Sequence, residues 1–281
     1  MQTVRQPPEA ALSASPGDRP APAPARRPAA GLARSAELVM HLAWRELTAT
    51  HRFTLLGWAW PLVRQLAQLA VLVLVFSSIF DLGIENYPVF VFSGLIAWSW
   101  FSSGLLAAST TLLAQRHLVY KARFPTIVLP LVAVAVPLVD VAMAIPVLLA
   151  MLLIQGGLEW SVLLLPPLLL VQLVLTCGLA WFAAALTVYL RDVPQLVNVA
   201  LTILFYLTPV FYSTDRIPQE YRWIIQLNPM TTLIESYRAV LLGDRFPPTG
   251  HFVAVAVAGV LIAVAGLLCF RRLSGGFVDE L

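Results

Sequence analysis

Six long apolar stretches occupy most of the chain after residue 61, and each is bounded by charged residues, Gly or Pro. A helix needs about 20 apolar residues to cross the ~30 Å hydrocarbon core of a bilayer. Apolar runs of this length without alternating polarity favour helices over a β-barrel, because backbone groups in lipid must be paired internally. The sequence therefore predicts an all-α integral membrane protein with spans at residues 62–80, 89–113, 127–154, 162–190, 197–212 and 252–270.

The distribution of positive charge predicts how the chain is oriented, because short cytoplasmic loops retain Lys and Arg. Thirteen of the 18 Lys and Arg residues fall in the tail before the first span, in the loops that follow the second and fourth spans, or directly after the last span. Arg64 lies at a span boundary. We therefore expect a multi-pass protein of the bacterial inner or plasma membrane with both termini in the cytoplasm. The net charge of +3 reflects this bias and gives no reason to expect a nucleic-acid partner.

The region before the first span has two parts. Residues 1–34 are rich in Pro, Ala and Arg and lack an apolar run, which predicts a disordered cytoplasmic tail. Residues 36–52 place charged and apolar side chains on separate helical stripes, as in a helix lying along the membrane surface. A cytoplasmic extension of the first span is the alternative. We assign residues 35–281 to one membrane domain, which the first true span must insert, since the tail has no secretory-signal core.

The sequence lacks the motifs that ATP hydrolysis and metal-dependent catalysis require. The only lysine is Lys121, which has no Gly-rich phosphate loop around it. There is no His-Glu-x-x-His helix, and both cysteines, Cys177 and Cys269, fall in predicted spans without metal-ligand spacing. We therefore expect no catalytic, cofactor-binding or metal-binding residue in this chain. A membrane-embedded transferase would need a polar cluster at one face, whereas Arg191 and Asp192 are predicted opposite Asp215 and Glu220.

One carboxylate, Asp140, lies near the centre of the third predicted span, where a charge costs about 2.5–3.5 kcal/mol on insertion scales. It could relay protons, as in a proton-coupled transporter. No other predicted span contains a second acidic residue or a histidine for such a relay, which favours a structural hydrogen bond to a neighbouring helix. The same span contains Pro130, Pro137 and Pro146, which free backbone carbonyls.

The segments between the spans resemble those of ABC type-2 transporter permeases that export polysaccharides and teichoic acids. Residues 118–125 match the Leu-x-x-Lys-x-x-Phe-Pro signature of that family. Four further matches follow its order: Leu56-Gly57 with Trp60-Pro61, Arg191-Asp192-Val193, Thr208-Pro209-Val210, and Asn228-Pro229 with Tyr237-Arg238. The sequence departs from the pattern at Arg64 and Gln65, where the family often has Asn-Pro, and at Gln115, where it usually has Asn.

The resemblance implies a permease subunit that performs no bond chemistry. It would pair with a second copy of itself and with two copies of a separate ATPase, which binds ATP and Mg²⁺. The implied substrate is a lipid-linked glycan, of the O-antigen, teichoic acid, galactan or capsule type, moved to the outer face for cell-envelope biosynthesis. An exporter of drugs or small lipids is the alternative within the family. Contact with the ATPase is expected at Arg116, His117, Lys121, Arg123, Phe124 and Pro125, whose cations could otherwise be ordinary cytoplasmic anchors.

Polar and aromatic residues within the spans suggest a substrate path. Asn198, Thr202 and Tyr206 recur every four residues, as one stripe of a helix, and Gln65 and Gln68 lie on the first span. Aromatic rings could stack on sugars, although interhelical or lipid-facing packing is the alternative. The candidates for this stacking are Trp98, Trp100 and Phe101, with Tyr212 near the outer mouth.

The external segment 213–250 predicts two short helices before the last span. They could dip into the outer face as re-entrant helices that close the exit, or lie on the leaflet. Asp192 is placed to cap the helix that begins near Pro194. Structural or gating roles are therefore expected for Arg191, Asp192, Pro209, Asn228, Pro229, Arg238 and Asp140.

Overall fold

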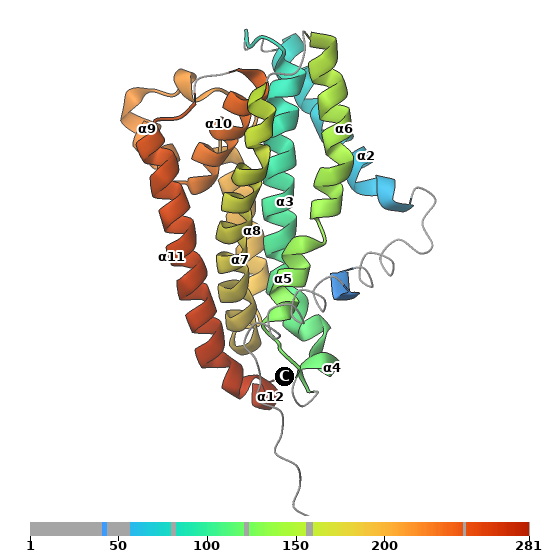
Figure 1. Ribbon diagram of the computed structural model, residues 1–281, viewed down its shortest axis with the longest axis vertical. Coiled ribbons are helices and arrows are strands. Elements are labelled where there is room, and N and C mark those ends of the chain that lie inside the picture. The colour runs from blue at the N-terminus through green and yellow to red at the C-terminus, as the bar shows by residue number, and fades with distance from the viewer. Residues whose placement is uncertain are drawn as a thin grey trace, which may run out of the picture.

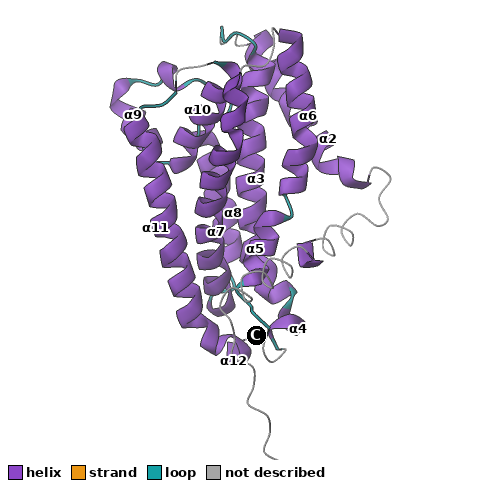
Figure 2. Cartoon of the chain, viewed as in Figure 1, coloured by secondary structure: helices purple, strands orange, loops and turns teal. Residues whose placement is uncertain are grey.

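The computed structural model describes residues 41–43, 57–79, 83–120, 124–155, 160–243 and 246–280. These residues form helices and connecting loops, with no strand among them (Figures 1 and 2). The helices of eight residues or more are α2 (Trp60–Val73), α3 (Tyr87–Ala114), α5 (Val128–Ala135), α6 (Leu138–Gln155), α7 (Leu165–Tyr189), α8 (Val193–Leu207), α9 (Gln219–Gln226), α10 (Pro229–Leu242) and α11 (Thr249–Leu273). Shorter helices are α4 (Arg116–Val119) and α12 (Phe277–Glu280).

Five helical segments of the described chain are long and apolar enough to cross a membrane, which confirms an all-α membrane protein. They are Trp60–Ser77, Tyr87–Ala114, Val128–Ile154, Trp160–Tyr189 and Thr249–Glu280. The remaining predicted span corresponds to α8, which has only 15 residues. Its length of ~22 Å is less than the ~30 Å hydrocarbon core, so a count of six spans stays a prediction.

The most extensive helix packing in the bundle joins α7 to α11 and to α3. Glycines permit the close approach of α7 and α11: a Cβ at Gly266 would lie 2.1 Å from the carbonyl oxygen of Gly178. A Cβ at Gly178 would in turn lie 2.6 Å from Cα of Ala263. Small residues allow helix backbones to approach in this way, and van der Waals packing then stabilises the pair in lipid.

The third predicted span is broken rather than continuous. Helix α5 ends at Ala135 and α6 begins at Leu138, because Pro137 has no N–H for a helical bond and its ring clashes with the preceding turn. The indole nitrogen of Trp100 donates to the carbonyl of Val134 at 3.1 Å, which ties α3 to the chain just before the break. Pro146, by contrast, is accommodated inside α6.

Helix α8 also differs from its predicted limits of 197–212. It begins at Val193, with a proline in its first turn, and ends at Leu207. Thr208 is extended, with φ −88° and ψ 135°, as expected for a residue that precedes proline. The apolar residues from Val210 to Tyr212 therefore follow the helix instead of extending it.

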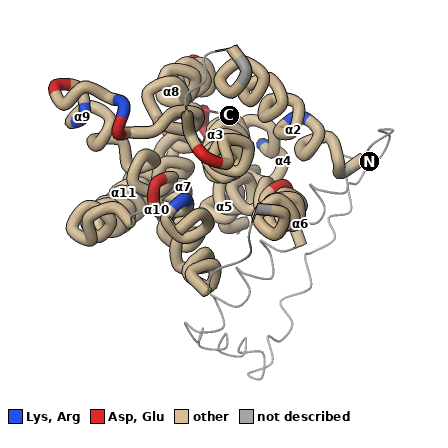
Figure 3. Tube along the Cα trace, turned by 90° about the horizontal axis from the view of Figure 1, so that it is seen from above, with Lys and Arg blue, Asp and Glu red and all other residues tan. Residues whose placement is uncertain are grey.

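The two external helices have different surroundings. Most residues of α10 are buried, and the helix packs against α3, α7 and α11. Helix α9 is largely exposed, including Trp223 and Leu227 at 60% and 72%. Figure 3 shows α9 at the edge of the molecule with charged residues on and beside it, while most of the other tubes are uncharged. The prediction of re-entrant helices thus fits α10 and not α9.

An apolar cluster joins the elements at the opposite end from α9, where α4 and α12 lie (Figure 1). This α4 cluster consists of Leu112, Leu118, Val119, Leu129, Ala184, Ala185, Val188, Phe270 and Phe277. The indole of Trp181 adds a hydrogen bond to the carbonyl of Ile127 at 3.1 Å. His41, Leu42 and Ala43 are helical, and Ala43 packs against Val128 and Val132 of α5. The tail 1–34 and the rest of the predicted surface helix lie outside the described residues.

Candidate functional site

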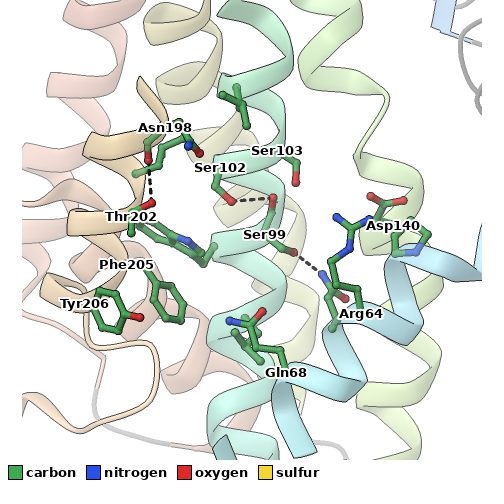
Figure 4. Close-up of a pocket in the computed structure, with 16 residues that line it drawn as sticks. Arg64, Gln68, Ser99, Ser102, Ser103, Asp140, Asn198, Thr202, Phe205 and Tyr206 are labelled. Carbon is green, nitrogen blue, oxygen red and sulfur yellow. Dashed lines mark hydrogen bonds between the residues drawn. The ribbon is translucent and has the colours of Figure 1, made fainter. Parts of the chain in front are cut away.

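A cavity of about 410 Å³ lies between α2, α3, α6 and α8. Figure 4 shows polar side chains from these helices directed toward one another across it. Its lining combines amides, hydroxyls, one guanidinium and one carboxylate with a smaller number of apolar groups. The lining residues are Pro61, Arg64, Gln65, Gln68, Leu95, Trp98, Ser99, Ser102, Ser103, Leu106, Asp140, Asn198, Leu201, Thr202, Phe205 and Tyr206.

The polar stripe predicted on residues 198–206 forms one wall of the cavity. Asn198, Thr202 and Tyr206 are all exposed on α8 and all line the cavity. The Thr202 hydroxyl donates to the backbone carbonyl of Asn198 at 2.9 Å, which satisfies its donor within the helix. The oxygen of Thr202 can still accept a hydrogen bond. The exposed side-chain amide of Asn198 offers both an acceptor oxygen and a donor nitrogen.

Helix α2 supplies the facing polar groups. Gln68 lines the cavity, and Gln65 is buried with its side-chain nitrogen donating to the hydroxyl of Ser99 on α3. The Oε1 atom of Gln65 is buried without a hydrogen-bond partner among the described residues. A buried amide oxygen without a hydrogen bond is destabilising. At this contact between α2 and α3 the nitrogen of the Gln65 amide is therefore hydrogen-bonded and its oxygen is not.

Three serines of α3 were not among the predicted site residues. Ser99, Ser102 and Ser103 line the cavity, and their spacing of three and four residues puts them on one face of the helix. Ser99 donates to the carbonyl of Ile96 at 3.1 Å, and Ser102 donates to that of Ser99 at 3.3 Å. The same spacing rule that identified the stripe on α8 could have found them, since small hydroxyl residues are easily overlooked in an apolar run.

The three aromatic candidates separate into two groups. Trp98 lines the cavity, with ring centroids 5.6 Å from Phe101 and 5.8 Å from Phe205. Trp100 and Phe101 are 2% and 4% exposed and do not line it. Stacking of a sugar on either ring would require repacking of the bundle, so their expected role in the path is corrected to interhelical packing.

Tyr212 is likewise absent from the cavity lining. Its hydroxyl donates to the carbonyls of Tyr206 and Leu207, at 3.2 and 3.1 Å, which closes the carbonyl end of α8. The chain reverses after Pro209, so Tyr212 returns toward its own helix. Its position supports a capping role rather than the predicted place in the path.

Asp140 on α6 and Arg64 on α2 lie on neighbouring helices at one side of the cavity, across from the polar residues of α8 (Figure 4). Asp140 is half-buried at the start of α6, one turn after Pro137. Arg64 lies on α2, and Figure 4 shows its side chain extended toward Asp140. Arg64 is therefore one turn from the start of its helix, near the span boundary that the sequence predicts, and its side chain lines the cavity.

The side chains of Arg191 and Asp192 make no hydrogen bond to another described residue. Both are exposed, and Asp192 occupies the residue before α8 without a side-chain capping bond. Its φ of −85° and ψ of −9° are helical, whereas a capping side chain needs an extended backbone to reach the free N–H groups. The prediction of a cap at Asp192 was wrong for this reason.

A group of bonds connects the end of α8 to α10 and α3, and we call it the outer node. Asn228 Nδ2 donates to the hydroxyl of Thr208 at 2.7 Å, and Asn228 Oδ1 accepts from the N–H of Met230 at 3.0 Å. Arg238 is buried; its guanidinium donates to the carbonyls of Val210 at 2.7 Å and Phe90 at 3.3 Å. Its Cζ lies 3.5 Å from the centre of the Phe90 ring.

Two of the motif segments, Thr208-Pro209-Val210 and Asn228-Pro229 with Tyr237-Arg238, thus meet in space at the outer node. A family model described as ABC-2 type transporter matches residues 37–242. The chain belongs to the ABC-2 type transporter family. The match ends at the last residue of α10, so the cavity and the outer node of this ABC-2 transporter both lie inside it.

Three relatives of this ABC-2 transporter are each named O-antigen export system permease protein RfbA. The one from Myxococcus xanthus is 32% identical over 247 residues, which cover 87% of this chain and 95% of that protein. Two from Klebsiella pneumoniae are 26% and 25% identical over 249 residues, with the same coverage. The similarity therefore extends over nearly the full length of these permeases.

Of the residues expected to contact an ATPase, the described ones, Arg116, His117, Phe124 and Pro125, lie at the end of the ABC-2 transporter that is opposite α9. Arg116 and His117 of α4 are exposed, while the adjacent Leu118 and Val119 are buried in the α4 cluster. Phe124 packs against this cluster and Pro125 follows it. Lys121 and Arg123 lie outside the described residues. The described part of this segment thus presents polar groups outward from an apolar base fixed to α3, α5, α7 and α11.

Proposed function

We propose that this ABC-2 transporter is the permease subunit of an exporter for a lipid-linked polysaccharide of the O-antigen kind. The observation that supports it most is the similarity to permeases named for O-antigen export over 87% of this chain. The chemistry of the cavity agrees: amides and hydroxyls on facing helices suit the hydroxyl groups of sugars, and Trp98 offers an apolar ring surface.

Energy for export would come from a separate ATPase. This chain contains no phosphate-binding loop, so ATP and Mg²⁺ would bind to the partner. The α4 segment is the proposed contact, because its base is packed into the spans and a push on it would move α3, α5, α7 and α11 together. In this account the chain itself makes and breaks no bond.

The proposed assembly contains two copies of the permease and two of the ATPase, with both termini in the cytoplasm. Large parts of α2 and α8 are exposed around the cavity, including Trp60, Ile203 and Tyr206. A second copy placed against these helices would close the cavity into a path. ATP-driven closure of the ATPase would then shift the permease between an inward-closed and an outward-open arrangement.

Deletion of the gene in its natural host tests the proposed function. We expect the surface polysaccharide to disappear and lipid-linked glycan to accumulate at the cytoplasmic face, measured by labelling of whole cells and by analysis of extracted lipids. Complementation with the intact gene should restore both. Normal surface polysaccharide in the deletion strain, with no accumulated intermediate, would refute a role in polysaccharide export.

A further inference from the structure

Arg64 differs in kind from the other cations of the chain. It is exposed on α2 within the segment Trp60–Ser77, four residues after Trp60 and so ~6 Å further along the helix. It lines the cavity, and its guanidinium has no hydrogen-bond or ion-pair partner among the described residues. The other described arginines lie on loops, at helix ends, on the exposed helix α9 or in the outer node.

A guanidinium inside a span is expensive unless something offsets its charge. Insertion scales give about 2.5–3.5 kcal/mol for Arg at a helix centre and the cost falls toward a helix end, where Arg64 lies; ionisable residues within spans commonly mark ligand paths. The groups around Arg64 are suited to an anion, since Gln68 and Ser103 can donate neutral hydrogen bonds into the same cavity. The planar fork of Arg also matches the geometry of phosphate and carboxylate oxygens.

We propose that Arg64 is an anion-binding residue of the cavity, which takes a phosphate or carboxylate group of the exported molecule. The inference rests on the proposed function, because it assigns chemistry to the same path. Two sources share this chemistry: a diphosphate that joins a glycan to its lipid carrier, or an acidic sugar in the glycan.

Asp140 places a negative charge beside Arg64 and so affects how tightly the site binds an anion. Its carboxylate lines the same side of the cavity from the neighbouring helix α6, and Figure 4 shows the Arg64 side chain directed toward it. A negative charge there offsets Arg64 when the cavity holds no ligand and repels an anion that enters. Transport needs binding that is favourable enough for entry and weak enough for release. Asp140 therefore keeps the affinity for the anion moderate.

Binding to the purified full-length permease in detergent tests the site. The first pair of probes is geranylgeranyl diphosphate and geranylgeraniol, and the second is a glucuronate-containing disaccharide and its neutral glucose analogue. Proteins to compare are the wild type, Arg64→Gln, Arg64→Lys and the control Arg272→Gln, which alters an exposed arginine at the end of α11. Equal unfolding temperatures will show that the variants are folded.

We expect at least one anionic probe to bind the wild type about tenfold more tightly than its neutral counterpart. Arg64→Gln should remove that difference, while Arg64→Lys should retain part of it and Arg272→Gln all of it. Dependence on the diphosphate identifies the carrier linkage, and dependence on glucuronate identifies an acidic sugar. Asp140→Asn should tighten binding of the same probe several-fold.

Equal affinity of wild type and Arg64→Gln for both anionic probes would overturn the proposal, as would no binding of either anion to the wild type. Weaker or unchanged binding by Asp140→Asn would overturn the role given to Asp140. Because this measurement uses neither the ATPase nor export, its result is independent of whether deletion of the gene removes a surface polysaccharide.

Discussion

The side-chain amide of Asn228 donates to the hydroxyl of Thr208 at 2.7 Å and thereby joins the start of α10 to the end of α8. Asn228 also caps α10, since its Oδ1 accepts from the N–H of Met230. Helix α8 forms the polar wall of the cavity, and α10 is buried among the spans at the outer end. One residue therefore connects the wall of the proposed path to the buried outer helix, and α8 cannot move without α10 unless this bond breaks.

Replacing Asn228 should show both contributions. Asn228→Ala removes the cap and the bond between helices, each of which is worth about 1 kcal/mol, so we expect a loss of about 1–3 kcal/mol in stability. Asn228→Asp keeps the oxygen that caps α10 and loses the donor to Thr208, so its loss should be smaller. Thermal unfolding in detergent measures the order. An unfolding temperature for Asn228→Ala equal to that of the wild type would show that the bond has no structural role.

The contact between α7 and α11 gives a second prediction. Gly266→Ala would put a methyl group 2.1 Å from the carbonyl oxygen of Gly178, so the two helices must separate. Overpacking of this kind costs about 1–3 kcal/mol, which corresponds to a fall of about 3–10 °C in Tm for a chain of this size. Gly259→Ala is a matched control on the same helix, because its methyl would lie 3.6 Å from Cβ of Leu175. Equal Tm values for the two variants would contradict the packing described here.

Much of the fold follows from the length and composition of the apolar runs. The runs around α3, α7 and α11 agree with the structure to within a few residues, since no charged residue interrupts them. Errors occur where proline acts against the apolar pattern. Pro137 breaks the third span, while Pro146 is accommodated inside α6. Hydropathy does not contain that information.

Loss of polarity on α8 should impair export without unfolding the protein. Thr202→Val removes a hydroxyl from the cavity wall and keeps the shape of the side chain, and adding Asn198→Leu removes a second polar group. With about 0.5–1.5 kcal/mol for each lost hydrogen bond to substrate, export should fall about two- to tenfold for each change. Surface polysaccharide on complemented deletion cells measures this effect.

The control for the α8 variants is Thr110→Val, which removes an exposed hydroxyl bonded to Ala107 on α3 outside the cavity. It should export normally. If Thr202→Val with Asn198→Leu exports as well as Thr110→Val at equal protein levels, the polar stripe does not contact the substrate.

The candidate site was only partly accessible from sequence. Periodicity on one helix identified Asn198, Thr202 and Tyr206, because spacing alone decides which residues share a face. Which face is turned to a cavity depends on packing between helices, and this separates Trp98, at the cavity, from Trp100, whose indole bonds to Val134. The meeting of Thr208 with Asn228 joins residues 20 positions apart through a chain reversal that local patterns do not describe.

Reversal of charge at the α4 end should separate ATP hydrolysis from export. Arg116→Glu changes an exposed residue over the α4 cluster, and the double variant Lys121→Glu with Arg123→Glu changes the signature segment. If these cations contact the ATPase, the variants should either fail to co-purify with it or hydrolyse ATP without exporting glycan. Arg272→Glu is the control at the same end. Export at wild-type levels by both α4 variants would remove this segment from the proposed coupling.

The central claim is that a separate ATPase drives a permease that has no energy source of its own. The most direct measurement is export of lipid-linked glycan in proteoliposomes that contain the permease with or without its ATPase, under ATP or under a proton gradient. We predict export only with the ATPase and ATP, and we predict that Asp140→Asn retains ATP-driven export. Export by the permease alone under a proton gradient, abolished by Asp140→Asn, would contradict the account.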